Sequence, residues 1–301
     1  MRYEVARVFS GVSGRSMILI TGATGTNGRE ILKQLSAKGV IARAMVRKRE
    51  DTKLPRTLNV EFVRGNFDDA ASLDAALAGV ERAFLLSPDS AEQVAREANF
   101  IRAAKRAGVR QVVKFSILGA APDSPSRLIR RHGEAEQMLR DSGIAFTMLR
   151  PHYFMQNLLW YINDIKSQGI FYASLPETYK HSHVDARDNA GVAVAALTES
   201  GHEGKVYHIT GPEALTYREA ADILSQAIGK KVRYDSSREN YAKFLKKIGL
   251  DVDEVLELDA CVANGIGDGS AVTNTIFEIT QQQPIRFEQF ANDYSQAFRA
   301  I

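Results

Sequence analysis

The chain has 301 residues, of which 45% are hydrophobic and 25% charged, and its formal net charge is +3. This composition is typical of a globular protein with one large or two smaller domains, and it argues against the massed basic surface of a nucleic-acid-binding protein. The single cysteine, Cys261, excludes a disulfide within the chain and a cysteine-rich metal site. No apolar run approaches the roughly 18 residues that a membrane helix needs.

We therefore expect a cytoplasmic protein that binds neither a membrane nor nucleic acid. Residues 1–16 precede the first predicted strand and lack the apolar core of a signal peptide, so we expect them to form a loosely held extension. The apolar stretches of the C-terminal helices could cover either a dimer face or an internal core, which leaves a homodimer open.

The most informative segment is a turn with three glycines between a strand and a helix. The apolar residues that precede Thr21 predict a buried strand, and residues 29–38 have the spacing of an amphipathic helix. Gly22 would permit a tight turn, Gly25 the approach of a diphosphate, and Gly28 the packing of helix on strand. The helix N-terminus would offer its free N–H groups to the diphosphate. The residues assigned to this dinucleotide site are Gly22, Thr24, Gly25, Thr26, Asn27 and Gly28; the alternative is a tight turn without a ligand.

Strands and helices then alternate along the first half of the chain. Strands are predicted at 41–46, 60–64, 83–86, 111–116 and 145–149, and helices from 68 or 69 to 77, from 90 to 107 and from 126 to 142. Ser90 with Gln93 has the spacing of a capping box. This alternation predicts an α/β fold of the Rossmann type, a doubly wound parallel sheet with ligands at the carboxyl ends of its strands. Further candidate residues follow those ends: Arg47, Asn66, Phe67, Ser87, Ser116 and Pro151.

The second half of the chain is mostly helical. Helices are predicted at 153–166, 188–198 and 217–228, strands at 205–209 and 232–234, and further helices over 237–297 with a break at 264–274. Thr216 and Glu219 form a second predicted capping box. We expect a nucleotide-binding domain over residues 17–152 and a smaller substrate-binding lobe over 153–301, which shares part of the sheet and is not independent.

Several segments together resemble one family. The glycine spacing Gly-x-x-Gly-x-x-Gly accompanies Thr-Gly-Ala-Thr-Gly at 21–25, and the other matching segments are 44–47, 63–68, 149–157, 183–190 and 207–217. In combination they resemble the NmrA-like atypical short-chain dehydrogenase/reductases over about residues 17–234. The resemblance implies either an NADPH-dependent reductase of quinones, triphenylmethane dyes or iminium ions, or a non-catalytic NADP sensor.

The residues after the second strand indicate the choice of cofactor. Arg47 is followed by Lys48 and Arg49, and no carboxylate occurs before Glu50. Arginine here accommodates the 2′-phosphate of NADP, whereas Asp or Glu favours NAD. We therefore predict NADP(H), the alternative being a solvated basic turn.

The residues after the third predicted strand, 60–64, are expected to lie close to the adenine of the cofactor. The family often has Asp where Asn66 stands, and an amide can still make a polar contact there. Phe67 could pack on the adenine ring or in the core.

The proton chemistry differs from that of ordinary short-chain dehydrogenases, because no Tyr-x-x-x-Lys occurs in the chain. Quinones, iminium ions and cationic dyes delocalise the incoming charge and need less help from a proton donor. The family resemblance places His132 near the substrate or the nicotinamide, where it could supply a proton. His132 and Glu136 share a helix face, so the alternative is a surface or ribose-side pair. Ser116 could bind the substrate or the ribose, or be only a strand-end hydroxyl.

The segment after the sixth strand is expected to line the nicotinamide end of the site. Here His152, Tyr153 and Phe154 could flank a flat, conjugated substrate or pack in the core, and Asn157 could make a polar contact.

The remaining polar residues of this half indicate structure and not chemistry. His181 and His183 lack the neighbours of a metal site, so no metal is predicted. Asp185 and Asp188 are interpreted as structural, one ending a strand and the other capping a helix.

These observations favour an NADPH-dependent reductase of a small conjugated acceptor. The main rival is an NADP(H) sensor that regulates a protein partner without turnover. An isomerase or epimerase of a nucleotide sugar is a weaker rival, because such enzymes normally keep the Tyr–Lys dyad.

Overall fold

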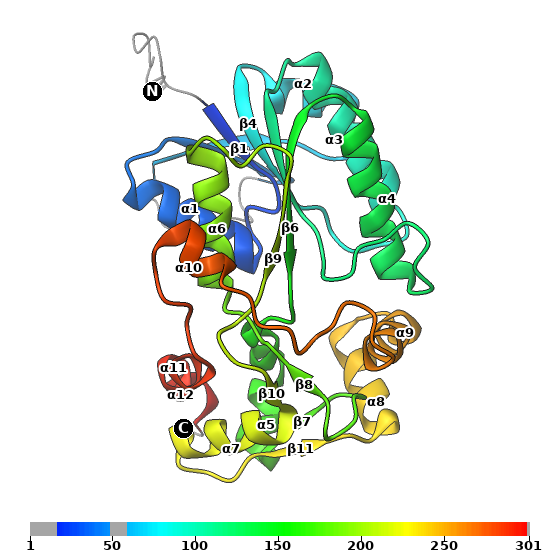
Figure 1. Cartoon of the computed structure of the whole chain (residues 1–301), viewed down its shortest axis with the longest axis vertical. Coiled ribbons are helices and arrows are strands. Elements are labelled where there is room, and N and C mark those ends of the chain that lie inside the picture. The colour runs from blue at the N-terminus through cyan, green and yellow to red at the C-terminus, as the bar shows by residue number, and fades with distance from the viewer. Residues whose placement is uncertain (1–16, 49–58, 300–301) are drawn as a thin grey trace, which may run out of the picture.

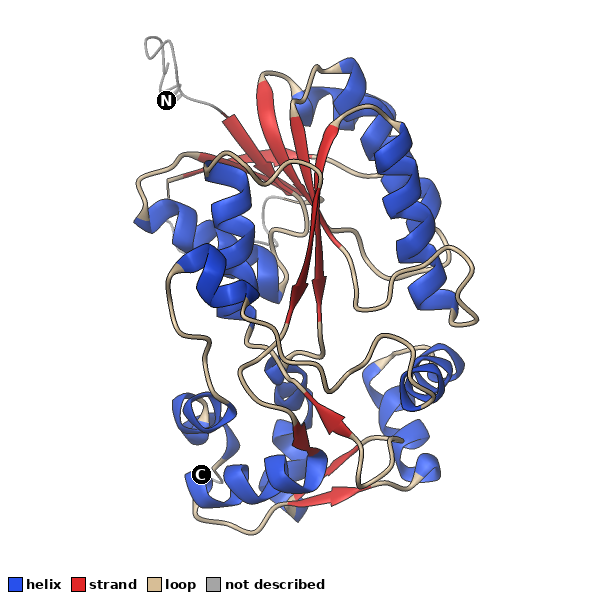
Figure 2. Ribbon diagram, viewed as in Figure 1, coloured by secondary structure: helices blue, strands red, loops and turns tan. Residues whose placement is uncertain are grey.

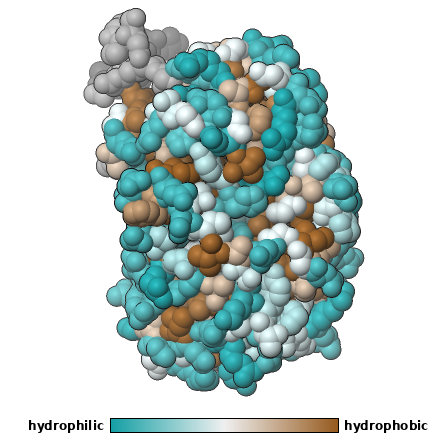
Figure 3. Space-filling view, viewed as in Figure 1, coloured by the Kyte–Doolittle hydropathy of each residue, from teal (hydrophilic) through white to brown (hydrophobic). Residues whose placement is uncertain are grey.

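The computed structural model describes residues 17–48 and 59–299. The predicted extension at residues 1–16 and the basic residue Arg49 therefore lie outside the described residues, as does Glu50. Within the described ranges, no helix is long and apolar enough to cross a membrane. The face drawn in Figure 3 is mostly hydrophilic, with its apolar residues in small separate groups.

The centre of the molecule is a seven-stranded, wholly parallel sheet, which confirms the predicted Rossmann-type fold (Figure 1). Its strands follow the order β3-β2-β1-β4-β5-β6-β9. They are β1 (Met17–Ile20), β2 (Ala42–Val46), β3 (Val60–Arg64), β4 (Val80–Leu85), β5 (Gln111–Phe115), β6 (Ala145–Pro151) and β9 (Lys205–Ile209). Ile20 lies opposite both Ala44 and Phe84, and the strand order changes direction between β1 and β4. Ligands of such sheets bind at this change of direction.

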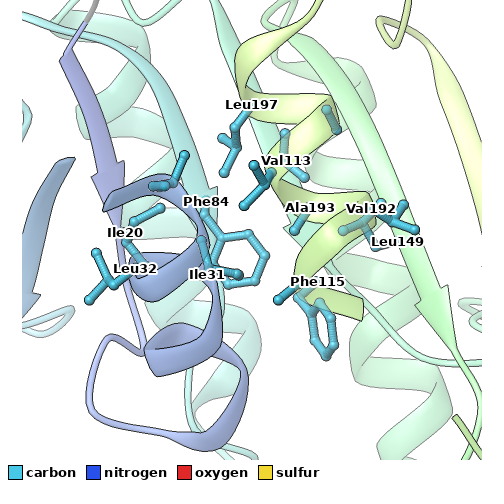
Figure 4. Packing of buried hydrophobic residues seen from close by; sticks show 14 of the residues in the cluster. Ile20, Ile31, Leu32, Phe84, Val113, Phe115, Leu149, Val192, Ala193 and Leu197 are labelled. Atoms are coloured by element: carbon cyan, nitrogen blue, oxygen red, sulfur yellow. The ribbon is translucent and has the colours of Figure 1, made fainter. Parts of the chain in front are cut away.

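Helices cover both faces of the sheet, as Figure 2 shows. One face carries α1 (Thr26–Ala37), α6 (Ala186–Thr198) and α10 (Thr275–Thr280), and the other carries α2 (Ala70–Leu77), α3 (Gln93–Arg106) and α4 (Arg127–Asp141). On the first face, Ile31 and Leu32 of α1 and Val192 of α6 form one buried cluster with Phe84 and Phe115 of the sheet (Figure 4). Burial of both faces explains why the strands are apolar along most of their length.

The remaining elements form a second lobe beyond the carboxyl ends of β6 and β9 (Figure 1). They are η2 (Met155–Tyr161), α5 (Ile162–Gln168), β7 (Ile170–Tyr172), β8 (Lys180–His181), β10 (Leu215–Thr216), α7 (Tyr217–Ile228), β11 (Arg233–Asp235), α8 (Arg238–Ile248), α9 (Val252–Ala263), α11 (Phe287–Asp293) and α12 (Ser295–Phe298). Their core is rich in aromatic rings, with Phe171, Phe287, Phe290 and Phe298 almost fully buried. The chain leaves this lobe to add α6 and β9 to the central sheet and then returns to it.

Two local predictions about helix caps are wrong and one is confirmed. The capping box of Thr216 and Glu219 is present at the start of α7. Ser90 does not cap α3, because the helix begins two residues later with Glu92 at the N-cap and the Gln93 side chain turns inward. Asp185, not Asp188, caps α6 through the backbone N–H of Arg187.

Two further details extend the sequence analysis. Asp188 accepts a hydrogen bond from the N–H of Ile285 at 2.8 Å, so its role is structural although it is not the cap. Strand β4 begins at Val80, three residues earlier than predicted.

Candidate functional site

The turn between β1 and α1 depends on its glycines. Gly22 has a φ of +61°, a conformation that side chains disfavour. A Cβ on Gly28 would lie 2.2 Å from the carbonyl oxygen of Gly22, so only glycine allows the helix to pack this closely. The hydroxyl of Thr21 donates to the carbonyl oxygens of Phe84 and Leu86, both at 3.0 Å, which ties the turn to β4.

The N-terminus of α1 is open to a ligand. Gly25 is its N-cap, and no side chain of the described residues caps it. Thr24, Gly25 and Thr26 are exposed, while Asn27 is buried and its Oδ1 has no hydrogen-bond partner in the described ranges. Free N–H groups at a helix N-terminus favour an anion. The residues present therefore fit the diphosphate of a dinucleotide.

The residues that follow β2 and β3 differ in whether their side chains are accessible to a cofactor. Arg47 is exposed and forms no ion pair with any residue of 17–48 or 59–299. Asn66 is also exposed, but its Oδ1 accepts from the N–H of Asp68 at 3.1 Å and so stabilises the turn before α2. Phe67 is buried against Phe100, with ring centroids 6.0 Å apart. Packing in the core accounts for Phe67, and a contact of either residue with adenine stays a prediction.

A buried ion pair that the sequence analysis missed lies behind the ends of β4 and β5. Lys114 Nζ is 2.6 Å from Glu97 Oε2, and the two side chains are 0% and 1% exposed. Ser87 donates to Glu97 Oε1 at 2.9 Å, so this predicted cofactor residue turns toward α3. Gln93 approaches the same oxygen at 3.4 Å. The available signal was one charged residue, Lys114, between the apolar residues Val113 and Phe115 of a buried strand.

His132 lies on α4 beside this ion pair. It is buried, and the amide nitrogen of Gln93 is 3.2 and 3.4 Å from its two ring nitrogens. Asp89 Oδ1 lies 3.5 Å from His132 Nε2.

The predicted partner of His132 is engaged elsewhere. Glu136 binds Arg150 of β6 at 2.6 and 2.8 Å. Burial raises the pKa of Glu136, but the hydrogen bonds and charge of Arg150 outweigh that effect and hold the pKa below its usual range. Ser116 Oγ is buried near Glu136, and its interaction with that carboxylate helps to hold the pKa of Glu136 low. The structure thus brings Ser116, His132 and Glu136 to the same side of the sheet.

The four predicted substrate residues point in different directions. Nδ1 of buried His152 is 2.6 Å from Ser182 Oγ, and burial lowers the pKa of His152 to about 4, so the ring is neutral at pH 7. The Tyr153 hydroxyl donates to Asp259 of α9 at 2.9 Å, and Phe154 packs against the sheet at Phe115. Pro151 is buried at the end of β6, and Asn157 is half-buried in η2. The contact of these four residues with a substrate, and that of Pro151 with the cofactor, stays a prediction.

Two parts of the second lobe reach this edge of the sheet. On α9, Glu254 binds Arg131 and Glu257 binds Arg127, which joins the lobe to α4. The predicted break at 264–274 passes the end of β9, where the N–H of Thr273 donates to Thr210 Oγ1 at 2.9 Å. The carbonyl of Gly269 accepts from the N–H of Ser182 at 2.9 Å. The candidate site is therefore bounded by both halves of the chain.

The remaining histidines of interest lie in the aromatic core of the lobe. His181 packs against Tyr153 and Tyr217, with ring centroids 4.7 and 5.1 Å away, and His183 lies beside it. Over residues 17–48 and 59–299, no three His, Cys, Asp or Glu residues are arranged to hold a metal ion.

Comparison with known proteins decides the family. Residues 14–283 match the NmrA-like family. This chain belongs to the NmrA-like family. This match confirms the family resemblance seen in the sequence.

Three NmrA-like proteins are informative. The chain is 40% identical to an NAD(P)H azoreductase of Xenophilus azovorans, over 94% of this chain and 100% of that one. It is 37% identical to a (4-alkanoyl-5-oxo-2,5-dihydrofuran-3-yl)methyl phosphate reductase of Streptomyces griseus, over 94% and 99% of the two chains. It also resembles the structure of an NADPH-dependent quinone oxidoreductase from Escherichia coli in complex with NADPH, with a TM-score of 0.81, 30% identity and coverage of 92% and 99%.

Proposed function

We propose that this chain is an NADPH-dependent reductase that transfers hydride to a small conjugated acceptor, such as a quinone, an azo compound or an iminium ion. The relatives confirm the prediction of an oxidoreductase that uses NADP(H). Their names refer to an azo compound, an oxo-dihydrofuran and a quinone. Each of these has a π system that can take up hydride and spread the charge, which supports the proposed acceptor class.

The open N-terminus of α1 beside its glycine turn carries the proposal. The backbone N–H groups after Gly25 would hold the diphosphate, and Arg47 would bind the 2′-phosphate. NADPH, when bound, supplies the hydride. The exposed guanidinium of Arg47 has no partner among the described residues that would compete with a phosphate.

The side chains of α4 that could donate a proton also support the proposed acceptor class. The chain has no Tyr-x-x-x-Lys, and Glu136 on α4 is already held by Arg150. His132 supplies the imidazole on this helix face and is our candidate proton donor. A conjugated acceptor stabilises much of the incoming charge itself, so positioning and one imidazole are sufficient for the reaction.

The acceptor class can be tested with a matched panel of substrates. NADPH absorbance is followed with a quinone, an azo dye, a cyclic iminium ion and an unconjugated ketone, with NADPH binding measured in the same samples. We expect oxidation of NADPH with at least one conjugated acceptor and none with the ketone. Equally fast reduction of the ketone would contradict the argument from the missing dyad. Bound NADPH without oxidation by any acceptor would favour the non-catalytic sensor.

Replacement of His132 tests the proton donor. Because a placed general acid contributes roughly 10²- to 10⁴-fold, we expect His132→Ala to lower kcat by about 10²-fold. A smaller loss is expected for acceptors that carry a permanent positive charge, since these need no proton. Unchanged NADPH oxidation in His132→Ala, with every acceptor, would show that His132 has no such role.

A further inference from the structure

The second lobe is fastened to α4 by two arginine–glutamate pairs of unequal quality. Glu254 accepts from both terminal nitrogens of Arg131, at 2.7 and 2.8 Å, and these side chains are only 12% and 15% exposed. Glu257 binds Arg127 Nε at 3.2 Å, with exposures of 33% and 40%. A bidentate and largely buried pair fixes the orientation of its guanidinium, whereas an exposed pair does so weakly.

Arg131 directs its Nε donor at Gln93. Its Nε lies 3.3 Å from Gln93 Oε1. A guanidinium has only donors, so the amide must present its oxygen to Arg131 and its nitrogen to the other side. On that side lie the ring nitrogens of His132 and Oε1 of Glu97. The orientation of Arg131 therefore determines whether the nitrogen or the oxygen of the Gln93 amide lies beside His132.

This arrangement also selects the proton position on His132. The amide nitrogen of Gln93 is a donor, so the ring nitrogen that it binds must accept. Nε2 is the nearer ring nitrogen, 3.2 Å from the amide nitrogen, so this contact places the proton on Nδ1, whereas the carboxylate of Asp89, 3.5 Å from Nε2, favours a proton on Nε2. Loss of the Arg131 contact would free the amide of Gln93 to rotate and present its oxygen instead. With the amide oxygen near Nε2, both Gln93 and Asp89 would favour a proton on Nε2, and the preferred tautomer of His132 would change.

We propose that Glu254 is a positioning residue, through which the docking of α9 on α4 sets the orientation and tautomer of His132. The contacts run from Glu254 to Arg131, from Arg131 to Gln93 and from Gln93 to His132. The inference rests on the proposed function insofar as His132 donates a proton there. It adds that the donor is in place only when the second lobe is docked on α4.

The chain provides a matched pair of variants for the test. Glu254→Gln and Glu257→Gln both weaken an arginine pair between α9 and α4, but only Glu254 is connected to Gln93 through its arginine. We expect Glu254→Gln to lower kcat about tenfold while KM for NADPH and acceptor stays within about twofold, as for a group that acts on the reacting step. Glu257→Gln should leave kcat unchanged.

A spectroscopic measurement tests the positioning without any substrate. The ring ¹⁵N signals of His132, identified by their absence in His132→Asn, report its tautomer. We expect them to shift in Glu254→Gln and to stay in place in Glu257→Gln. Arg131→Lys keeps the positive charge but loses the planar fork and the Nε donor, so it should shift the signals as Glu254→Gln does. Thermal unfolding verifies that each variant is folded.

Two results would overturn the proposal. One is unmoved His132 signals in both Glu254→Gln and Arg131→Lys, and the other is an equal shift in Glu257→Gln. Either would mean that the arginine pairs only hold the lobe in place. Because the ¹⁵N measurement needs no acceptor, a protein that oxidised NADPH with no compound would refute the proposed function and leave this test intact.

Discussion

The two ends of the candidate site are built by different means. Near β1 and α1, the backbone of seven consecutive residues, Gly22 to Gly28, forms the turn, and side chains contribute little. Behind β4 and β5, the site consists of side chains that come from distant segments, among them Lys114, His132 and Glu254. A site made of backbone depends on local geometry, whereas a site made of side chains depends on every partner being present.

The largest effect is expected when one partner of the buried ion pair behind β4 and β5 is removed. Lys114→Met would leave the carboxylate of Glu97 buried without its counter-charge, which lowers the free energy of unfolding by about 3–5 kcal/mol. Urea denaturation measures this loss. The double variant Lys114→Met/Glu97→Gln should recover most of it, because no charge is then left buried. A cost below about 1 kcal/mol for the single variant would remove the contrast between the two regions.

The backbone region can be broken by one methyl group. In Gly28→Ala the new Cβ would clash with the carbonyl oxygen of Gly22. We expect the free energy of unfolding to fall by about 2–3 kcal/mol and NADPH binding to be lost. Gly25→Ala is the control, because its Cβ would meet that oxygen at 3.3 Å. This control should stay folded and bind NADPH more weakly, as measured by calorimetry. Equal stability of the two variants would show that the close packing at Gly28 is not required.

The smallest effect is expected at Arg47, the exposed side chain of the backbone region. Arg47→Ala should weaken NADPH binding about tenfold, or about 1.4 kcal/mol, and leave NADH binding nearly unchanged. Titration of the two cofactors against wild type and variant measures the difference. If wild type already binds NADH as tightly as NADPH, the prediction of NADP(H) from Arg47 is wrong.

The same contrast explains what the sequence could reveal. The glycine turn and the capping box at Thr216 depend on residues within a few positions of each other, and both were predictable. The parallel sheet was predictable from the regular alternation of apolar strands and amphipathic helices along the chain. Gln93 was misassigned as a capping residue, because its spacing from Ser90 fits the motif while its actual neighbour, His132, is 39 positions away.

Other residues of the site carried no local signal at all. Glu254 and Asp259 lie on a helix whose pattern shows only that it is amphipathic, and their partners are on α4 and at the end of β6. Likewise, the i, i+4 spacing placed His132 and Glu136 on one helix face, but the actual partner of Glu136 is Arg150 on β6. Such pairings follow from the tertiary packing and have no counterpart in a sequence spacing.

The path of the chain through β9 limits how the protein can be divided. Cutting after residue 152 would remove both α6 and β9, although everything before that point resembles a complete nucleotide-binding unit. The seven residues of β6 would become an edge strand with unpaired backbone groups, and the apolar side chains beneath α6 would face water. Fusions or chimaeras that exchange the acceptor-binding half must therefore retain residues 186–209 with the first half, and join the new segment at the loops on either side.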